Sequence, residues 1–305
     1  MREQPWTYAD IGDLTGSRAL VTGVTSGVGE AVAQALAAHG AEVVLAGRNQ
    51  GRLTASLERL RDRVLDPLVR PLQLDLADQS SVRRAAAEAA TYGPLHLLVN
   101  NAGVMATPYA RTVDGFELQM ATNFLGHFTL TGLLLPQLVA GSARVVSVSS
   151  QGHRTVRTAP LQDPRLPPRR YHRWLTYARS KLANLLFAFE LDRRARAAGL
   201  PLTSVAAHPG IALTGLMASG HRGAAGGSIL DAAFSMLGQP PWQGALPLLM
   251  AATADLPGGT YVGPSGPGEA RGAPGIVGSS RLARDREAAG RLWRLAEGAT
   301  GVAYP

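Results

Sequence analysis

The segment Thr22-Gly23-Val24-Thr25-Ser26-Gly27-Val28-Gly29 follows a short apolar run and precedes a helix-forming run that starts at Glu30. Glycines at this spacing permit a tight turn and let the backbone approach a ligand closely. The N-terminus of the following helix points free N–H groups at an anion. Strand, glycine loop and helix in this order predict a phosphate-binding loop at the start of an α/β sheet.

The rest of the chain repeats the alternation of short apolar runs and amphipathic segments that begins at this loop. We expect strands at residues 19–22, 42–46, 69–73, 97–100, 144–149, 202–207 and 259–262. We expect helices at residues 28–38, 80–91, 177–198 and 244–252. This alternation is typical of a doubly wound parallel sheet, here of about seven strands, flanked by helices in three α/β/α layers.

We interpret residues 1–305 as a single domain, because no long linker and no internal repeat divides the chain. Two longer segments interrupt the alternation. One is an arginine- and proline-rich insertion at 152–174. The other, at 216–242, is rich in glycine with apolar residues between, and we interpret it as a lid over a hydrophobic substrate. Long irregular segments in compact domains are usually functional or disordered.

The composition excludes several kinds of site. The chain has no cysteine, which rules out disulfides, thiolate metal sites and cysteine nucleophiles. No histidines have the spacing of metal ligands, and we expect no metal. Residues 1–13 contain no apolar run, and no apolar stretch approaches the roughly 20 residues of a membrane-spanning helix. We therefore expect a cytoplasmic protein without a membrane anchor.

The net charge of +8 would suit a nucleic-acid-binding protein if the basic residues formed a stripe. They are scattered instead, so we expect a small-molecule substrate and no nucleic acid. We interpret the densest group as a solvated loop, with a surface for an anionic substrate or partner as the alternative. This group consists of Arg165, Arg169, Arg170 and Arg173.

The second expected strand ends in Gly47-Arg48-Asn49, without the carboxylate that would bind a ribose 2′-hydroxyl. Arg48 is a bidentate phosphate donor. This favours NADP(H) over NAD(H). The third strand is followed by Asp75, which either caps the next turn or contacts the adenine amino group.

Lys181 is the only lysine of the chain, and it lies one expected helical turn after Tyr177. A compact ammonium can approach a tyrosine oxygen and a ribose together, which a planar guanidinium cannot do. A free phenol has a pKa of about 10, and a nearby positive charge favours the phenolate. The fourth and fifth strands end in Asn101-Ala102-Gly103 and Ser149-Ser150, so their polar groups reach the same edge of the sheet.

Taken together, these motifs resemble the classical short-chain dehydrogenase/reductase family across nearly the whole chain. The resemblance implies a Rossmann-type fold and gives Tyr177 the role of proton donor or acceptor. It implies that Ser150, the second serine of its pair, hydrogen-bonds the substrate oxygen. It further implies that Lys181 binds the nicotinamide ribose and lowers the pKa of Tyr177. Asn123 matches the helix asparagine that holds a proton-relay water.

The expected cofactor site extends from the glycine loop to a proline-glycine turn after the sixth strand. It comprises Gly23, Thr25, Ser26, Gly27, Val28, Gly29, Arg48, Asn49, Asp75, Leu76, Asn101, Ala102, Gly103, Tyr177, Lys181, Pro209, Gly210 and Thr214.

Within the family, the segments 123–128, 177–184 and 292–297 look like the retinol dehydrogenase and protochlorophyllide reductase-like branch, which often uses NADP and apolar alcohols or carbonyl compounds. Thr25 departs from this branch, which usually has asparagine there. The glycine-rich stretch 220–227 also departs from it.

We therefore predict an NADP-dependent oxidoreductase, a ketoreductase in one direction, that interconverts a carbonyl compound and an alcohol. One alternative is epimerisation or reduction of a carbon–carbon double bond on the same scaffold. Another is a non-catalytic protein that senses NADP. The resemblance also implies a homodimer or homotetramer paired through the helices that contain Asn123 and Tyr177, with the insertion 152–174 as an element that could block the contact.

Overall fold

The computed structural model of the chain describes residues 5–165, 170–211 and 239–305. Most of the expected lid at 216–242 therefore lies outside the described residues, as do Arg169 and Thr214.

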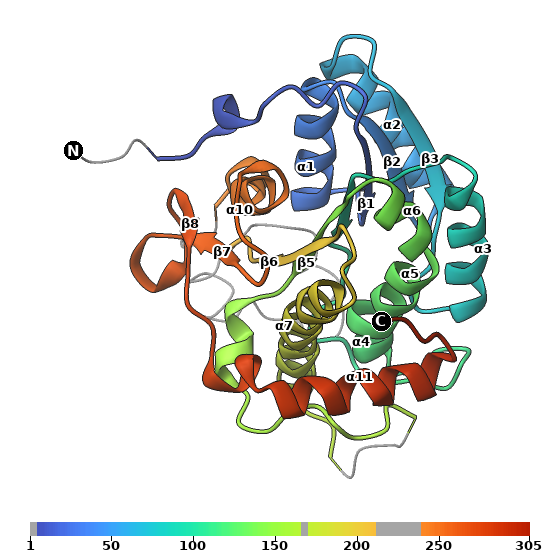
Figure 1. Ribbon diagram of the computed structural model, residues 1–305, viewed down its shortest axis with the longest axis vertical. Helices are drawn as coiled ribbons and strands as arrows, with labels where there is room; N and C mark the ends of the chain where they lie inside the picture. Colours follow the sequence, from blue (N-terminus) through green and yellow to red (C-terminus); the bar gives the residue numbers. More distant parts are fainter. Residues whose placement is uncertain (1–4, 166–169, 212–238) are drawn as a thin grey trace, which may run out of the picture.

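One sheet of eight strands forms the centre of the molecule, in the order β3-β2-β1-β4-β5-β6-β7-β8 (Figure 1). All neighbouring strands are parallel except β7 and β8, which pair antiparallel. The strands are β1 Arg18–Thr22, β2 Glu42–Gly47, β3 Val69–Gln73, β4 Leu97–Asn100, β5 Arg144–Val148, β6 Thr203–Ala207, β7 Tyr261–Pro264 and β8 Pro274–Ile276. The predicted doubly wound sheet is confirmed, and the order of its first six strands is that of a Rossmann fold.

The eighth strand was not expected. β8 is short, and it contains proline and glycine, which are depleted in strands. It pairs with β7 at the edge of the sheet, where a proline is tolerated.

Helices cover both faces of the sheet, which gives the three predicted layers (Figure 1). One face is covered by α1 Gly27–Ala38, α2 Gln50–Arg63 and α10 Pro241–Thr253. The other is covered by α3 Gln79–Ala90, α5 Gly126–Leu133 and α7 Arg173–Ala197, with α11 Arg286–Thr300 packed against α7. Shorter elements complete the described chain: the helices α4 Leu118–Met120 and α6 Leu135–Ala140, the π-helical turn η2 Ala121–Leu125, and the 3₁₀ turns η1 Tyr8–Asp10, η3 Gln151–Thr155, η4 Pro267–Glu269 and η5 Arg281–Arg284.

The strands are apolar along their length because both of their faces are buried. In β1, Ala19 and Val21 pack with α1 and α10, whereas Leu20 packs with the helices of the opposite face. Successive side chains of a strand point to opposite sides, so one short apolar run supplies both cores.

The C-terminal segment packs against the middle of the chain. The rings of Trp293 and Tyr304 lie 5.2 and 4.9 Å from that of Phe128 on α5, and Trp293 stacks on Phe187 of α7. The Tyr304 hydroxyl donates a hydrogen bond to the Phe128 carbonyl at 3.1 Å. This segment and α11 therefore cover part of the helical surface through which we expected pairing with a second copy.

The described part of the insertion 152–174 packs against the domain. Arg165 lies over the Phe116 ring at 4.7 Å and donates a hydrogen bond to the Ala299 carbonyl. The Tyr171 hydroxyl donates to Glu117, which caps α4. Arg165 thus contacts protein groups, but it is exposed, as are Arg170 and Arg173, which agrees with the solvated loop that we expected.

In the described ranges, no helix has both the length and the apolar character needed to cross a membrane. Those same ranges contain no group of three or more histidine, aspartate or glutamate side chains that could hold a metal ion.

Candidate active site

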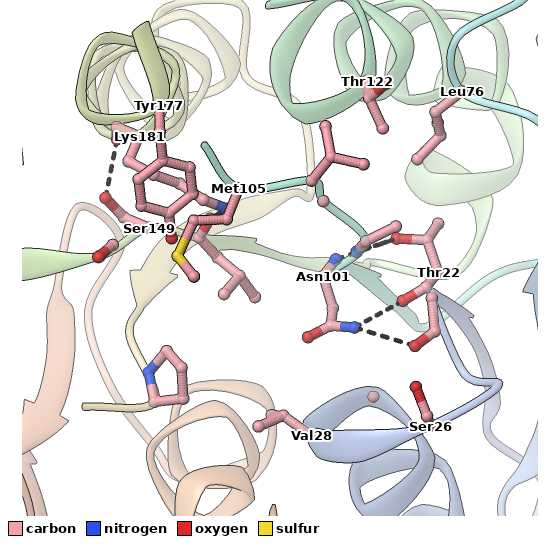
Figure 2. A pocket seen from close by; sticks show the side chains of 18 of the residues that line it. Thr22, Ser26, Val28, Leu76, Asn101, Met105, Thr122, Ser149, Tyr177 and Lys181 are labelled. Atoms are coloured by element: carbon pink, nitrogen blue, oxygen red, sulfur yellow. Dashed lines mark hydrogen bonds between the residues drawn. The ribbon is translucent and has the colours of Figure 1, made fainter. Parts of the chain in front are cut away.

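A cavity of about 580 Å³ lies along the carboxyl edge of the sheet, where parallel strands place their ligands. Its walls come from the segments that follow β1 to β6. Figure 2 shows Tyr177 and Lys181 on one side of this pocket and Ser26 and Val28 of the glycine loop on another.

The glycine loop fits closely against the loop after β4. Gly23 has a left-handed backbone with φ of 75°, and a Cβ there would lie 2.8 Å from the Ala102 Cα. A Cβ at Gly29 would lie 2.4 Å from Nδ2, the side-chain amide nitrogen of Asn101. Side chains at either position would therefore force these two loops apart. The Ser26 side chain makes no capping hydrogen bond to α1, so it does not compete with a ligand for the N–H groups of the first turn.

Thr22 ties the two loops together. Its hydroxyl oxygen accepts hydrogen bonds from the backbone N–H groups of Asn101 and Ala102 at 3.0 and 2.9 Å. The Asn101 side chain donates to the Thr22 carbonyl at 2.8 Å (Figure 2). The position of the loop after β4 is thus set by the last residue of β1.

His127 is a buried, neutral histidine behind this contact. Burial lowers its pKa to about 3. Its Nδ1 lies 3.1 Å from the Asn123 carbonyl, which can only accept, so Nδ1 carries the proton. Its Nε2, 2.9 Å from the Thr22 hydroxyl, is therefore the acceptor. His127 links β1 to α5 and has a structural role.

Asn123 lies in the π-helical turn η2, a type of irregularity that is frequent at functional sites. Its amide donates to the Val104 carbonyl and the Ser180 hydroxyl, and its oxygen accepts from the Val104 N–H. The side chain is fully buried and does not line the cavity. The side chain positions the loop after Gly103. The proton-relay water that the resemblance implies at Asn123 stays a prediction.

Tyr177 and Lys181 both face the cavity from α7. Lys181 is buried, and its Nζ donates to the Val148 carbonyl at 3.0 Å, which uses one of its three protons. The same Nζ lies 5.8 Å from the centre of the Tyr177 ring. The ammonium is therefore held between the end of β5 and the tyrosine.

Burial favours the neutral form of both groups and shifts their pKa values in opposite directions. It lowers the pKa of Lys181 to about 8. It raises the pKa of Tyr177, against a smaller lowering by a hydrogen bond from Ser150. We expected the neighbouring ammonium to lower the pKa of Tyr177. In the protein without cofactor, the loss of water around the phenol has the largest effect on the Tyr177 pKa, and it raises this pKa.

Ser149 and Ser150 have different surroundings. The Ser149 hydroxyl donates to the Lys181 carbonyl at 2.8 Å, so its proton is committed to α7 (Figure 2). The Ser150 hydroxyl is the one that acts on the Tyr177 phenol, whose pKa it lowers, and it accepts from the Gly152 N–H. Adjacent residues of an extended chain point in opposite directions, which separates the two serines.

The opposite end of the cavity carries two arginines. Arg48 follows β2, and Arg52 lies four residues later in the first turn of α2; both are exposed and line the cavity. Asn49 caps α2 by accepting from the Arg52 N–H at 2.9 Å. Asp75 lines the cavity, and its carboxylate also accepts from the Ala77 N–H, so the turn contact is present.

Most of the expected site residues line this one cavity. These are Gly23, Thr25, Ser26, Val28, Gly29, Arg48, Asp75, Leu76, Asn101, Ala102, Gly103, Ser150, Tyr177, Lys181, Pro209 and Gly210. Gly27, Asn49 and Asn123 do not line it. Several lining residues were missed, among them Thr22, Arg52, Met105, Gln151, Trp174 and Ile211. Of these, only Arg52 had a sequence signal, because it lies one helical turn after Arg48.

Comparison with known proteins identifies the family. A profile described as short chain dehydrogenase matches residues 17–160. Polyprenol dehydrogenase of Mus musculus is 41% identical over 293 residues, which are 91% of this chain and 82% of that protein. The chain belongs to the short-chain dehydrogenase/reductase family.

Retinol dehydrogenases are also similar to this chain. Retinol dehydrogenase 13 of Mus musculus is 34% identical over 297 residues, 95% of this chain and 85% of that protein. Retinol dehydrogenase 12 of Homo sapiens is 44% identical over 203 residues, and the chain spans only 62% of its length. A solved structure of an uncharacterised protein from Mycobacterium paratuberculosis is 41% identical, with a TM-score of 0.80, and the match covers 99% of this chain and 100% of that one. The chain therefore lies in the retinol dehydrogenase-like branch, as predicted.

Membership in this family makes the chain an oxidoreductase of carbonyl compounds and alcohols that uses a nicotinamide cofactor. The described residues fit such a dinucleotide. The two glycines Gly23 and Gly29 keep the loop free of side chains, and the N-terminus of α1 faces the cavity. Lys181 and Tyr177 lie in the same cavity as the arginines.

Proposed function

We propose that the chain is an NADP-dependent oxidoreductase that interconverts a hydrophobic ketone or aldehyde with its alcohol. The observation that carries this proposal is the pair of half-buried Tyr177 and buried Lys181, which share one cavity with Ser150, the glycine loop and Arg48.

Tyr177 acts as the general acid in the direction of reduction. Its raised pKa keeps the phenol protonated near neutral pH, so it can donate a proton to a carbonyl oxygen. Ser150, which lines the cavity together with Tyr177, holds the same oxygen and fixes the approach of the substrate. The bound nicotinamide supplies or accepts the hydride.

Lys181 binds the nicotinamide ribose and assists proton movement at Tyr177. One of its N–H groups is held by the Val148 carbonyl, and two are left for the ribose and for the tyrosine oxygen. Asn123 holds the Val104 backbone at the cavity wall and so keeps the loop after β4 in place.

Arg48 and Arg52 support NADP as the cofactor. Two guanidinium groups at the end of β2 suit a 2′-phosphate, and no carboxylate from Gly47 to Arg52 competes for the ribose hydroxyl. A hydrophobic substrate is supported by the apolar side chains of Met105, Trp174 and Ile211 in the cavity. The names of the relatives refer to polyprenol and retinol, which are also apolar alcohols.

Three further expectations stay predictions: a single domain, a cytoplasmic location, and a homodimer or homotetramer.

The test is the reaction of the purified chain with an unsaturated aldehyde. We expect trans-2-nonenal and NADPH to give the allylic alcohol, with faster turnover than with NADH. The product is identified by mass spectrometry, and consumption of reduced nicotinamide gives the rate. The short aldehyde propanal serves as a control for hydrophobic selectivity.

Other results would support another function or another cofactor. A saturated aldehyde as product would show reduction of the double bond. Tight NADPH binding without turnover of nonenal, long-chain ketones or alcohols would support the sensing protein. Equal binding and turnover with NADH would contradict the preference for NADP.

A further inference from the structure

Glu269 has a backbone conformation that is unfavourable for its residue type. It ends the turn η4 after β7, and its φ of 54° lies in the left-handed region. This conformation is unfavourable for a residue with a Cβ, which approaches the following carbonyl oxygen too closely. Such strain persists only where surrounding contacts hold it, and it clusters at functional sites.

The carboxylate of Glu269 joins two separate segments. From the segment after β5, it accepts hydrogen bonds from the Gln151 amide and, at 3.0 Å, from the Arg154 guanidinium. From the segment after β6, it accepts one from His208 Nε2 at 3.1 Å. The Arg154 guanidinium also donates to the Gln151 side-chain oxygen at 2.8 Å, which closes the cluster.

The partners of Glu269 are direct neighbours of residues at the reaction centre. Gln151 follows Ser150, and both line the cavity. His208 precedes Pro209 and Gly210, which line the facing wall. Glu269 itself does not line the cavity. It therefore acts on the cavity only through the two segments that it connects.

The hydrogen bonds of His208 define its proton position. The Gly210 N–H donates to Nδ1 at 3.2 Å, so Nδ1 is an acceptor. Nε2 therefore carries the proton and donates it to Glu269. His208 is completely buried, and a Cβ at Gly263 would lie 2.0 Å from its Nε2, so the ring has little freedom to rotate away.

A second set of contacts, from the segment after β8, holds the backbone of Ser150. The Ser280 N–H donates to His153 Nε2 at 3.1 Å, so His153 Nδ1 carries the proton and donates to the Ser150 carbonyl at 2.7 Å. The backbone of Ser150 is thus held by His153, and the residue after it is held by Glu269.

We propose that Glu269 is a positioning residue for proton and hydride transfer, which holds the Ser150 segment and the His208-Pro209-Gly210 turn at a fixed separation. The substrate oxygen lies against the first segment and the nicotinamide against the second, so their separation decides the transfer geometry. This inference rests on the proposed function.

The charge and the length of the side chain both matter. The carboxylate offers only acceptors, and all three neighbours are donors. In Glu269→Gln, the new N–H₂ group would face at least one of these donors and break the cluster. Glu269→Asp keeps the carboxylate but shortens its reach.

The test compares Glu269→Gln with Glu42→Gln. Glu42 is the matched control, because it also accepts three hydrogen bonds, from Arg18 and Arg70, but lies at the opposite edge of the sheet. We expect kcat with trans-2-nonenal and NADPH to fall about 10- to 100-fold in Glu269→Gln, since small misplacements of reacting groups have effects of this size. The Kd for NADPH should change less than about threefold, because the glycine loop, Arg48 and Arg52 of the proposed cofactor site lie outside the Glu269 cluster.

In the control, kcat per folded molecule should equal that of the wild type. Glu269→Asp should recover part of the lost kcat, which a role confined to stability would not predict. A wild-type kcat in folded Glu269→Gln, or losses that only follow the folded fraction in both variants, would overturn the inference.

The tautomer of His208 gives a readout that does not need turnover. In wild type, ¹⁵N NMR should show His208 protonated at Nε2, and this signal should change in Glu269→Gln and not in Glu42→Gln. If the wild type lacks turnover with every carbonyl compound, the proposed function fails. Independently of turnover, a His208 signal that is the same in wild type and in Glu269→Gln would contradict the hydrogen bond between His208 and Glu269. The positioning role depends on this bond.

Discussion

The two ends of the cavity use positive charge in different ways. At the end that we propose for the adenosine, here the adenosine end, Arg48 and Arg52 are exposed and extend from the start of a surface helix. At the end that we propose for the nicotinamide, here the nicotinamide end, Lys181 is buried, and burial lowers its pKa to about 8. Arginine at the first end offers a fork of donors to a phosphate. Lysine at the second end can lose its proton, which arginine cannot do in a protein.

Binding of a phosphate tolerates exposure to solvent, whereas the proposed proton transfer requires that solvent is excluded. A 2′-phosphate can be bound at an exposed position, because charge and hydrogen bonds there do not require desolvation of the protein. A tyrosine acid and its lysine neighbour need a site from which water is excluded, since their pKa shifts depend on it. Substitutions at the two ends should therefore affect different measured quantities.

The largest effect should come from Tyr177→Phe at the nicotinamide end. Removal of the hydroxyl removes the proton donor, so we expect kcat with NADPH to fall about 10²- to 10⁴-fold, the usual contribution of general acid–base catalysis. The Kd for NADPH, measured by nicotinamide fluorescence, should stay within about threefold of wild type. Activity close to wild type would show that another group supplies the proton.

A smaller effect is expected from the pKa of Lys181. In the folded protein this pKa is lowered to about 8, and in the unfolded chain it is near 10.4. Below pH 8 both states hold the proton, so the full cost of burying the ammonium is present, about 3 kcal/mol. Between pH 8 and 10.4 the unfolded state binds more protons, so the folded state becomes more stable as pH rises.

Lys181→Met isolates this effect, because methionine does not titrate. We expect the free energy of unfolding of the wild type, minus that of Lys181→Met, to rise by about 1.4 kcal/mol per pH unit above pH 8. Urea unfolding at pH 7, 8, 9 and 10 provides the measurement. A difference that is constant over this range would mean that Lys181 has an ordinary pKa. The charge at the nicotinamide end would then be no more affected by burial than the exposed arginines at the adenosine end.

The smallest effect should come from Arg48→Ala at the adenosine end. Hydrogen bonds to a charged group contribute about 1.5–3 kcal/mol, so the Kd for NADPH should rise about 10- to 100-fold. The Kd for NADH should change little, and kcat at saturating NADPH should be unaffected. Arg61→Ala serves as the control, because Arg61 is exposed on the same helix but does not line the cavity. Equal losses for NADPH and NADH would show that Arg48 does not bind the 2′-phosphate.

The sequence was sufficient to predict the parts of the molecule that depend on local chemistry. The glycine loop, the sheet and the pair of Tyr177 and Lys181 on one helix all follow from spacing and residue type. The two serines after β5 could not be separated by physical argument from the sequence alone. Their surroundings differ because Ser149 contacts the Lys181 carbonyl, a partner 32 residues away.

Other contacts lie beyond sequence reasoning for the same reason. Glu269 meets Gln151 and His208 only because β7 lies beside β6 in the sheet and the turn after β7 returns to the cavity. Nothing in the local pattern Gly266-Pro267-Gly268-Glu269 indicates a functional carboxylate. The effect of burial on the Tyr177 phenol also required the structure, because the sequence supplies the charges but not their exposure to water.

The packing of Tyr304 and Trp293 against Phe128 has a consequence for synthesis of the chain. Trp293 and Tyr304, the C-terminal partners of Phe128 and Phe187 in this aromatic cluster, emerge from the ribosome more than a hundred residues later, and Tyr304 bonds to a residue 176 positions earlier. During that interval, apolar surface of α5 and α7 is exposed to other unfolded chains. The half of the molecule that carries Tyr177 and Lys181 is therefore completed last, and we expect newly made chains to depend on chaperones at this stage.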